Sequence, residues 1–277
     1  MNKLATILIG VAVAASSTVI FAATSSDTPA SKLINKIIGA QGHIVQSFPA
    51  VDGLTGFVVQ SNQGGNNNGI LYADVKGQYI FAGSIINAQG QDLTQQYTNE
   101  YINSKIAGPA YAQAMSLNYF TSGSDNAPHK AFVIIDPNCI FCHTLYQKVE
   151  PLIESGQLQV RWLPVAFRDP SSPGKAAAML NAGSDVAAAK LLAQNEVNFN
   201  DQTESGSLTP IQPDSKDPAV TAAFNKVAQN TQFFSQSGFN GTPTILYKQT
   251  DGKVIMIPGL PQGQAFDAML SNMGSTW

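Results

Sequence analysis

The chain has 277 residues, a formal net charge of −3 at pH 7 and only 12% charged residues. Soluble domains usually contain about 25% charged residues, so this surface must depend on uncharged polar side chains. Nucleic acids and anionic membrane surfaces are bound by clustered positive charge, which this composition does not supply, so we expect no nucleic-acid partner. The length allows one large domain or two smaller ones.

The N-terminus has the pattern of a secretory signal peptide. Lys3 supplies the positive charge, residues 4–15 form a short apolar run, and Ala22-Ala23 offers a small-residue cleavage site. The polar break Ser16-Ser17-Thr18 favours cleavage over the alternative, an uncleaved membrane anchor. We therefore predict that residues 1–22 are removed on export into an oxidising compartment, where disulfides form and exchange.

Residues 24–88 are expected to form a small N-terminal α+β domain. Helical and alternating apolar patterns predict a helix over 28–41 and strands over 43–48, 54–60, 70–75 and 78–86. A unit of about sixty residues is marginal for burying a core alone, so dimerisation would stabilise it.

Residues 89–120 are predicted to form a linker helix between two domains. The segment 92–106 is polar with weak helical periodicity, as expected of a helix that connects two bodies. Gly108-Pro109 should interrupt this helix, which then continues to Tyr119. The stretch 121–129 is rich in Ser, Gly, Asn and Pro, and it marks the boundary before the second domain.

The remaining residues, 121–277, have the element order of an α/β domain: strand, helix, strand, helical insert, strand hairpin and final helix. The continuous apolar run Ala131 to Ile135 predicts a strand that is buried on both faces. The helical insert occupies about 171–236, and its first helix has Ser172 and Pro173 as the expected N-cap and N1 residues. The final hairpin is predicted over 244–257.

Cys139 and Cys142 are the two cysteines of the chain, and they form a C-x-x-C motif between a predicted strand and a predicted helix. This arrangement indicates a thioredoxin-like redox site. Cys139 lies at the helix N-terminus, where unpaired amides and the helix dipole favour the thiolate. Cys142 shares the apolar helix face with Leu145 and Val149, and Cys139 falls off that face. We therefore predict an exposed nucleophile, Cys139, and a sheltered Cys142 that resolves the mixed disulfide.

The two cysteines also allow three other interpretations: a haem attachment site, a zinc site and a structural disulfide. With His143 the motif reads C-x-x-C-H, which matches the attachment sequence of c-type haem. A zinc site needs four ligands, and His129 and His143 combined with the cysteines fit no common zinc spacing. A structural disulfide would close too short a loop to stabilise the chain much. For His143 itself, the default roles are a solvated side chain or a positive neighbour of Cys139.

Asp136 lies three residues before Cys139, and we expect it to form the turn rather than to react. Pro243 precedes an apolar strand, and base rates alone favour a trans bond before it. If the bond is cis, the backbone at Thr242 would lie against the sulfurs, because Pro243 has no amide to donate. Thr242 and Pro243 would then bind an extended substrate segment.

Several short motifs carry a family resemblance: Ala107-Gly108-Pro109-Ala110, Asp136-Pro137-Asn138-Cys139-x-x-Cys142, Pro151 with Ser155-Gly156, and Gly241-Thr242-Pro243 with Gly259-Leu260-Pro261. With these motifs the chain resembles the DsbC/DsbG family of periplasmic thiol:disulfide interchange proteins over essentially its whole mature length. DsbC-like members usually carry a second cysteine pair, which is absent here, so the chain looks closer to DsbG.

The resemblance implies an α+β protein: a thioredoxin-like catalytic domain with a helical insert, and a small cystatin-like N-terminal dimerisation domain joined by a linker helix. It also implies a V-shaped homodimer, a cis bond at Thr242–Pro243 beside Cys139, and a membrane reductase of the DsbD type as electron donor. The chain departs from the family at Ile140-Phe141, where DsbG-like sequences tend to have Pro-Tyr. Val133 stands where thioredoxins place a buried Asp, which argues against their proton relay.

We therefore predict a periplasmic thiol:disulfide oxidoreductase that requires no cofactor or metal. It would reduce sulfenylated cysteines or isomerise non-native disulfides in oxidised or unfolded periplasmic proteins, with chaperone activity as an accompanying property. Two alternatives remain open. One is a non-redox chaperone whose uncharged cleft shields unfolded chains, and the other is a c-type haem protein that uses the C-x-x-C-H sequence.

Overall fold

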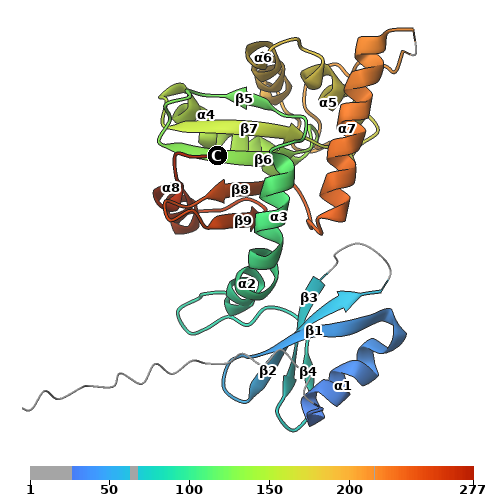
Figure 1. The fold of residues 1–277 in the computed structure, drawn as a ribbon, viewed down its shortest axis with the longest axis vertical. Helices are drawn as coiled ribbons and strands as arrows, with labels where there is room; N and C mark the ends of the chain where they lie inside the picture. Colours follow the sequence, from blue (N-terminus) through green and yellow to red (C-terminus); the bar gives the residue numbers. More distant parts are fainter. Residues whose placement is uncertain (1–26, 63–67, 215) are drawn as a thin grey trace, which may run out of the picture.

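The computed structural model describes residues 27–62, 68–214 and 216–277. The predicted signal peptide, residues 1–22, lies outside the described residues. Two β-sheets organise the described chain, and a helical segment joins them (Figure 1). The first sheet has four strands in the order β1-β2-β3-β4, and the second has five in the order β5-β7-β6-β8-β9.

The first sheet and one helix make up the N-terminal unit. Its elements are α1 (Pro29–Ile38), the 3-10 turn η1 (Gly39–Gln41), and the antiparallel strands β1 (Gly42–Pro49), β2 (Leu54–Ser61), β3 (Asn68–Asp74) and β4 (Ile80–Phe81). Strand β4 is much shorter than predicted. Before β4, the Asp74 carboxylate accepts the amides of Gln78 and Tyr79 at 2.7 and 2.6 Å. After β4, the Ile85 amide donates to the Thr94 hydroxyl at 2.9 Å instead of to a strand.

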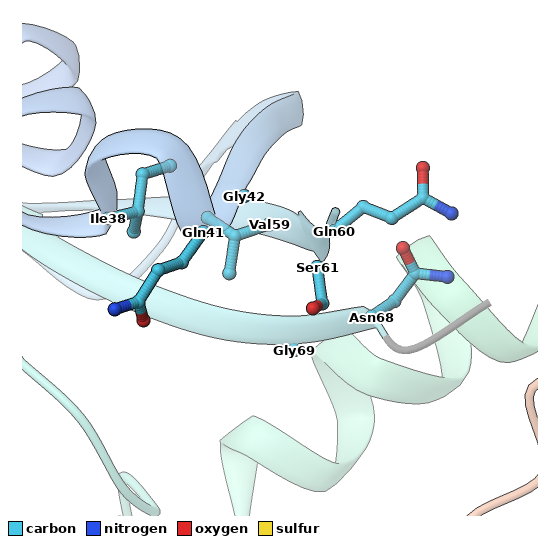
Figure 2. A pocket seen from close by; sticks show the side chains of 8 residues that line it. All are labelled: Ile38, Gln41, Gly42, Val59, Gln60, Ser61, Asn68 and Gly69. Atoms are coloured by element: carbon cyan, nitrogen blue, oxygen red, sulfur yellow. The ribbon is translucent and has the colours of Figure 1, made fainter. Parts of the chain in front are cut away.

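A shallow pocket of about 370 Å³ lies on this unit (Figure 2). It is lined by Ile38, Gln41, Gly42, Val59, Gln60, Ser61, Asn68 and Gly69. These eight lining residues have no ionisable side chain, and both cysteines belong to the other unit. The pocket is therefore not a candidate for the redox chemistry.

The connecting segment consists of α2 (Leu93–Thr98), one π-helical turn η2 (Asn99–Asn103) and α3 (Ser104–Ala114). The prediction that Gly108-Pro109 interrupts the helix is wrong, because Pro109 lies inside α3. A proline in a helix costs about 3 kcal/mol, and here tertiary contacts outweigh that cost. The buried residues Ala107, Ala110 and Tyr111 pack against the second sheet on both sides of the proline.

The second sheet contains β5 (Phe120–Ser122), β6 (His129–Ile135), β7 (Leu158–Pro164), β8 (Thr244–Lys248) and β9 (Val254–Pro258). Strand β6 is central and pairs parallel with β7 and antiparallel with β8. All five residues from Ala131 to Ile135 are at most 2% exposed, which confirms the strand buried on both faces. Alternate residues of β6 face two different cores: Val133 belongs to one and Phe132 to the other.

Helices cover both faces of this sheet (Figure 1). They are α4 (Ile140–Glu154), α5 (Ser172–Leu180), α6 (Asp185–Glu196), α7 (Pro218–Gln236) and α8 (Gln264–Asn272). The core that contains Val133 includes side chains from α4, α6 and α8, and the core that contains Phe132 includes side chains from α3 and α7. Helices α5, α6 and α7 form the predicted insert between β7 and β8. The antiparallel first sheet and the mixed second sheet with its helices confirm the α+β class. No helix in the described residues is long and apolar enough to cross a membrane.

Candidate active site

Both cysteines lie at the start of α4, directly after the central strand β6. Cys139 is the N-cap of α4, and its Sγ accepts the amide of Cys142 at 3.3 Å. The amide of Cys139 donates to the Asp136 carbonyl at 3.0 Å, which closes the turn between strand and helix. The prediction that Cys139 occupies a helix N-terminus is confirmed.

The prediction that Cys139 is exposed is wrong. Cys139 is 1% exposed and Cys142 is 5% exposed, so the structure buries both residues. The Cys139 thiol donates to the Thr242 carbonyl at 3.1 Å, from a segment 103 residues further along the chain. Helical periodicity shows which face of α4 meets the sheet, but it contains no information about a distant segment that covers the cap.

Thr242 and Pro243 lie beside the sulfurs, immediately before β8. The Thr242–Pro243 bond is cis, as the family resemblance implied. The Pro243 carbonyl accepts the amide of Gly259 at 2.7 Å, and this bond ties the segment to the end of β9. The Thr242 hydroxyl is buried and has no well-formed hydrogen bond to the described residues. The fold therefore brings Cys139, Cys142, Thr242 and Pro243 together from two distant parts of the sequence.

The two thiols differ strongly in acidity. The Cys142 thiol, as a hydrogen-bond donor, makes the largest contribution to lowering the pKa of Cys139, which falls to about 7. The Thr242 side chain, the Cys142 amide and the positive charge of Arg168 add to this effect, while burial opposes it. Burial raises the pKa of Cys142 well above its ordinary value, and the neighbouring Cys139 raises it further. Near neutral pH about half of Cys139 is therefore thiolate, while Cys142 stays protonated.

Asp136 organises the turn, as predicted, through four hydrogen bonds to its carboxylate. One oxygen accepts from the Asn138 amide at 3.0 Å and the Ser172 hydroxyl at 2.7 Å. The other accepts from the amides of Phe167 and Arg168 at 2.8 and 3.1 Å. Ser172 was expected to be the N-cap of α5, but Ser171 occupies that position. The Ser172 hydroxyl instead fastens the insert to Asp136.

Sequence reasoning missed a buried polar cluster behind Cys139. The Asn138 side chain donates to the hydroxyls of Ser171 and Ser172 at 3.0 and 2.9 Å. Its oxygen accepts from Lys175 Nζ at 2.6 Å and from the Gly206 amide at 3.3 Å. Both donors and both acceptor positions of the Asn138 side-chain amide are therefore used. Lys175 is 3% exposed, and burial lowers its pKa. A lysine among the small apolar residues of α5 was the signal that could have pointed to this cluster.

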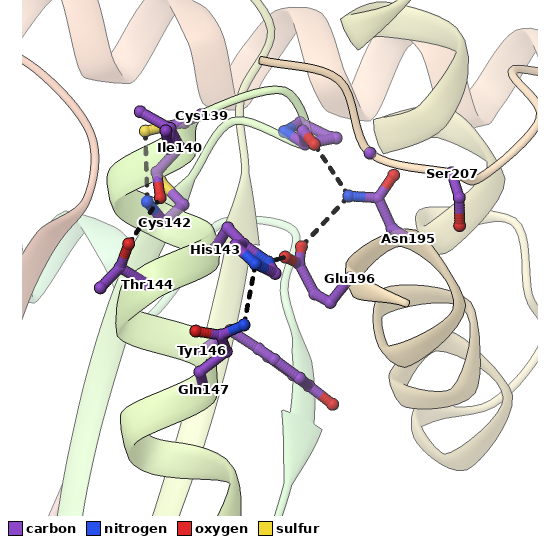
Figure 3. A network of polar contacts seen from close by, with 12 residues as sticks. Cys139, Ile140, Cys142, His143, Thr144, Tyr146, Gln147, Asn195, Glu196 and Ser207 are labelled. Atoms are coloured by element: carbon purple, nitrogen blue, oxygen red, sulfur yellow. Dashed lines mark hydrogen bonds and ion pairs between the residues drawn. The ribbon is translucent and has the colours of Figure 1, made fainter. Parts of the chain in front are cut away.

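His143 forms a second link to the insert, with Glu196 at the end of α6 (Figure 3). Its Nδ1 lies 2.7 Å from Glu196 Oε2, and the two side chains are 13% and 7% exposed. The ring stacks on Phe199 with centroids 4.5 Å apart, and Nε2 contacts the Gln147 amide group at 2.9 Å. The expectation of a solvated His143 is therefore wrong. Burial raises the pKa of Glu196, against the opposing effect of His143.

This geometry bears on the haem and metal alternatives. A haem attachment site needs accessible cysteines and a free imidazole nitrogen, whereas both cysteines are covered and both nitrogens of His143 are engaged. The residues therefore do not fit a c-type haem. In the described part of the chain, no three His, Cys, Asp or Glu side chains are grouped closely enough to hold a metal ion.

Comparisons with known proteins agree with a thiol:disulfide site at the two cysteines. The family of thioredoxin-like domains matches residues 121–274. The chain is 27% identical over 219 residues to the thiol:disulfide interchange protein DsbG of Pseudomonas aeruginosa, covering 79% of this chain and 80% of that protein. It is 26% identical over 238 residues to the protein of the same name from Escherichia coli, covering 86% of this chain and 90% of that one.

Solved structures give weaker likenesses. DsbG of Helicobacter pylori is 16% identical and covers 79% of this chain and 98% of its own, with a TM-score of 0.40. A linker-deletion variant of Proteus mirabilis ScsC is 14% identical and covers 69% of this chain and 97% of its own, with a TM-score of 0.45. The assignment depends instead on the sequence matches, which extend over more than half of the chain and include both cysteines. The chain belongs to the family of thioredoxin-like domains, and over most of its length it is similar to thiol:disulfide interchange proteins named DsbG.

Proposed function

We propose that this protein is a periplasmic oxidoreductase of the DsbG type, which reduces sulfenylated cysteines or isomerises non-native disulfides. One observation carries the proposal. The N-cap Cys139 has a pKa of about 7, and its partner Cys142, one helical turn away, is kept protonated by burial. A site that holds one thiolate beside one thiol is suited to attack an oxidised sulfur and then to release the product.

The catalytic roles follow from this difference in acidity. The Cys139 thiolate attacks the oxidised sulfur of the substrate and forms a mixed disulfide. Cys142 then loses its proton and attacks Cys139, so the substrate leaves as a thiolate and the cysteine pair becomes a disulfide. In isomerisation, a second thiol of the substrate resolves the mixed disulfide instead. Two electrons pass from the pair to the substrate in the reductive reaction.

Thr242 and Pro243 are the proposed substrate-binding residues. The Thr242 carbonyl already accepts a bond from the Cys139 thiol at 3.1 Å, so this backbone lies where a substrate segment must approach. Pro243 has no amide, so it makes no competing donor beside the sulfurs. An extended substrate segment would run along this backbone, with its oxidised cysteine over Cys139.

The proposed setting is the periplasm, supported by the signal-peptide pattern of residues 1–22 and by the family. The oxidised pair must be reduced again after each turnover. We assign this step to a dithiol donor of the DsbD type, on the basis of the family resemblance. The substrates would be oxidised or unfolded periplasmic proteins.

A homodimer is the proposed assembly, formed through the N-terminal unit. Large apolar side chains are exposed there: Val45 46%, Val75 57%, Tyr79 65%, Phe81 47% and Ile86 64%. Exposed apolar side chains in one small unit favour burial against a second copy. Pairing through these residues would leave the two sets of cysteines on separate catalytic units.

Substitution of each cysteine tests the proposed function. We expect Cys139→Ser to abolish turnover because the nucleophile is lost. We expect Cys142→Ser to accumulate mixed disulfides with periplasmic proteins, visible on non-reducing gels and identified by mass spectrometry. The redox proposal fails if Cys142→Ser captures nothing while Cys139→Ser retains activity.

A chaperone function is the second candidate. It is favoured by two exposed aromatic side chains, one within the C-x-x-C motif and one in the loop that binds Asp136. Phe141 is 54% exposed in the first turn of α4, and Phe167, whose amide binds Asp136, is 47% exposed. The protein with both cysteines changed to Ser distinguishes the candidates. Undiminished suppression of aggregation by that variant, together with no measurable thiol turnover by the wild type, would favour the chaperone.

A further inference from the structure

Arg168 lies in the loop after β7, at the same end of the sheet as the two cysteines. Strands β6 and β7 run parallel and end side by side, with Ile135 opposite Pro164, so the segments that follow them meet. The Arg168 amide donates to the Asp136 carboxylate at 3.1 Å, and the Asp136 carbonyl accepts the Cys139 amide at 3.0 Å. Only the residue Asp136 therefore separates the backbone of Arg168 from that of the nucleophile.

The guanidinium of Arg168 has N–H donors that form no hydrogen bond with the described residues. It forms an ion pair with Glu204, and the two side chains are 33% and 42% exposed. Among the residues that the structure describes, Glu204 is its one hydrogen-bond partner, although a guanidinium carries five N–H donors. The charge of Arg168 also acts on Cys139, after the larger effects of Cys142 and Thr242 in lowering its pKa. A partly exposed cation with free donors thus stands within electrostatic range of the reacting sulfur.

Glu204 is held in place by an unusual backbone. Its φ of 47° lies in the left-handed region, which a residue with a Cβ rarely adopts. The loop around it is fixed by paired bonds between Asn200 and Ser205 at 2.9 and 3.1 Å. Gly206, two residues on, is fixed by Asn138 and Lys175. Residues in such conformations persist where the surrounding structure determines them and occur often at functional sites.

We propose that Arg168 is a specificity-determining residue that hydrogen-bonds the oxygen of a sulfenic acid on the substrate cysteine, while Glu204 holds the guanidinium in position. This inference rests on the function proposed above and specifies one substrate class for it. A disulfide substrate has a sulfur in place of that oxygen and makes a poorer acceptor. Arg168 therefore favours sulfenylated cysteines over disulfides.

The reaction balances without an added reagent. The Cys139 thiolate attacks the sulfenyl sulfur, the S–O bond breaks, and the oxygen leaves with its electron pair as hydroxide, which becomes water with the proton that Cys142 gives up in the next step. An S–S bond between Cys139 and the substrate forms in the same step. Negative charge grows on the departing oxygen, and a guanidinium beside it stabilises that charge most in the transition state. Cys142 then completes the reduction as described above.

The test compares two substrates across three variants of the full-length protein: Arg168→Gln, Arg168→Lys and, as a matched surface-charge control, the exposed Lys226→Gln. One substrate is a single-cysteine protein converted to its sulfenic acid with peroxide, and the other is a small uncharged disulfide, 2-hydroxyethyl disulfide. Each second-order rate is divided by the fraction of Cys139 thiolate, measured from the absorbance of the thiolate at 240 nm. This correction removes the effect of Arg168 on the acidity of Cys139.

We expect Arg168→Gln to lower the corrected rate with the sulfenic acid roughly tenfold and to leave the rate with the disulfide unchanged. Arg168→Lys should give an intermediate loss because it keeps the charge but lacks the planar fork. Lys226→Gln should change neither rate. Equal losses on both substrates, or no loss on either, would overturn the role of Arg168.

Further measurements distinguish recognition of the sulfenic-acid oxygen from recognition of carboxylates, and failure of the proposed function from failure of the role of Arg168. A third substrate, a peptide disulfide with aspartate beside the cysteine, must not show the selective loss; if it does, Arg168 recognises carboxylates and the inference is wrong. If the wild type reduces disulfides but not the sulfenic acid, the sulfenic-acid reductase function itself fails. If the wild type reduces both and Arg168→Gln does so equally well, only the role of Arg168 fails.

Discussion

At the scale of single residues, the acidity of Cys139 is determined mainly by contacts with the first turn of its own helix. The Cys142 thiol and the Cys142 amide both act on the same sulfur. A bond donated by a protonated Cys139 to the Thr242 carbonyl works in the opposite direction, because only the thiol can make it. The balance lowers the pKa of Cys139 to about 7, which is well suited to exchange at neutral pH.

This acidity predicts how the reduced protein reacts with iodoacetamide as the pH changes. Cys139 is an acid with a lowered pKa, so its thiolate is present above pH 7 and is lost as the pH falls below it. We expect a single alkylated cysteine and a rate with a midpoint close to pH 7, decreasing tenfold for each pH unit below that midpoint. Cys139→Ser should react negligibly up to pH 9. A midpoint near that of free cysteine would contradict the electrostatic description of the site.

Asp136 predicts a stability effect without direct participation in the reaction. Its carboxylate accepts two bonds on each oxygen. In Asp136→Asn one oxygen becomes an NH₂ group that faces other donors, so we expect a loss of about 2–4 kcal/mol in the free energy of unfolding. Urea denaturation of the reduced protein measures this loss. Asp169→Asn, at an exposed position in the loop between β7 and α5, should cost much less.

The residues of the site differ in how far their roles could be predicted. The apolar run before the C-x-x-C motif predicted that Cys139 lies at a helix N-terminus, and the apolar helix face that includes Cys142 predicted the burial of Cys142. The family resemblance placed the Thr242–Pro243 bond beside Cys139, but the local periodicity that predicted an exposed Cys139 contains no information about a segment 103 residues away. Asn138 and Lys175 were missed because their partners come from different elements: the lysine in apolar α5 signals a buried charge but does not identify what it binds.

At the scale of elements, the insert is fastened to α4 by the pair His143–Glu196. The pair is largely buried, and Asn195 next to it donates to the Glu196 carboxylate at 3.1 Å and to the Pro137 carbonyl at 2.8 Å. The end of α6 is thus connected both to the first turn of α4 and to the turn before Cys139. Breaking a buried pair leaves a charge without its partner, which usually costs 3–5 kcal/mol.

We expect His143→Leu to reduce the free energy of unfolding by roughly 2–4 kcal/mol at pH 7. The sign of its pH dependence follows from Glu196, whose pKa is already raised by burial and should rise further without His143. A carboxyl group with a raised pKa contributes stability below its unfolded value, near 4.5, and loses it as the pH rises through the folded value. The variant should therefore become more stable as the pH falls from 7 towards 5.

Urea denaturation at the two pH values measures this effect. Gln147→Ala removes the exposed partner of the other ring nitrogen and serves as the control, with little expected change at either pH. A loss in His143→Leu that is identical at both pH values would show that packing against Phe199, rather than the charge of Glu196, is what the substitution removes.

Elements were predictable where one local signal dominated. The apolar run of β6 is an example, because a strand covered on both faces needs no alternation. Strand β4 and helix α3 differ from prediction because other contacts outweigh the local pattern. On the two sides of β4, the Asp74 carboxylate accepts two backbone amides, and the Thr94 hydroxyl accepts the amide of Ile85. In α3 packing on the second sheet carries the helix through Pro109.

At the scale of the whole molecule, exposed apolar surface is concentrated in the N-terminal unit. We expect the full-length protein to sediment as a dimer at micromolar concentration, and Tyr79→Arg combined with Phe81→Arg to yield a monomer, because charge in an apolar interface is costly. The rate of Cys139 alkylation should not change. Val186→Arg, at a residue that is 67% exposed in the catalytic unit, is the control and should leave the mass unchanged. A wild-type monomer would disprove the proposed assembly.

The cover over the Cys139 sulfur also determines which molecules can reach it. The Thr242 carbonyl must give up its bond before anything larger than a small reagent touches that sulfur. A rigid protein with its oxidised cysteine set below the surface cannot make that exchange, whereas a projecting or unravelled strand can replace the lost bond with one of its own. The accessibility of the oxidised cysteine on a substrate therefore determines whether it can react with Cys139 at all.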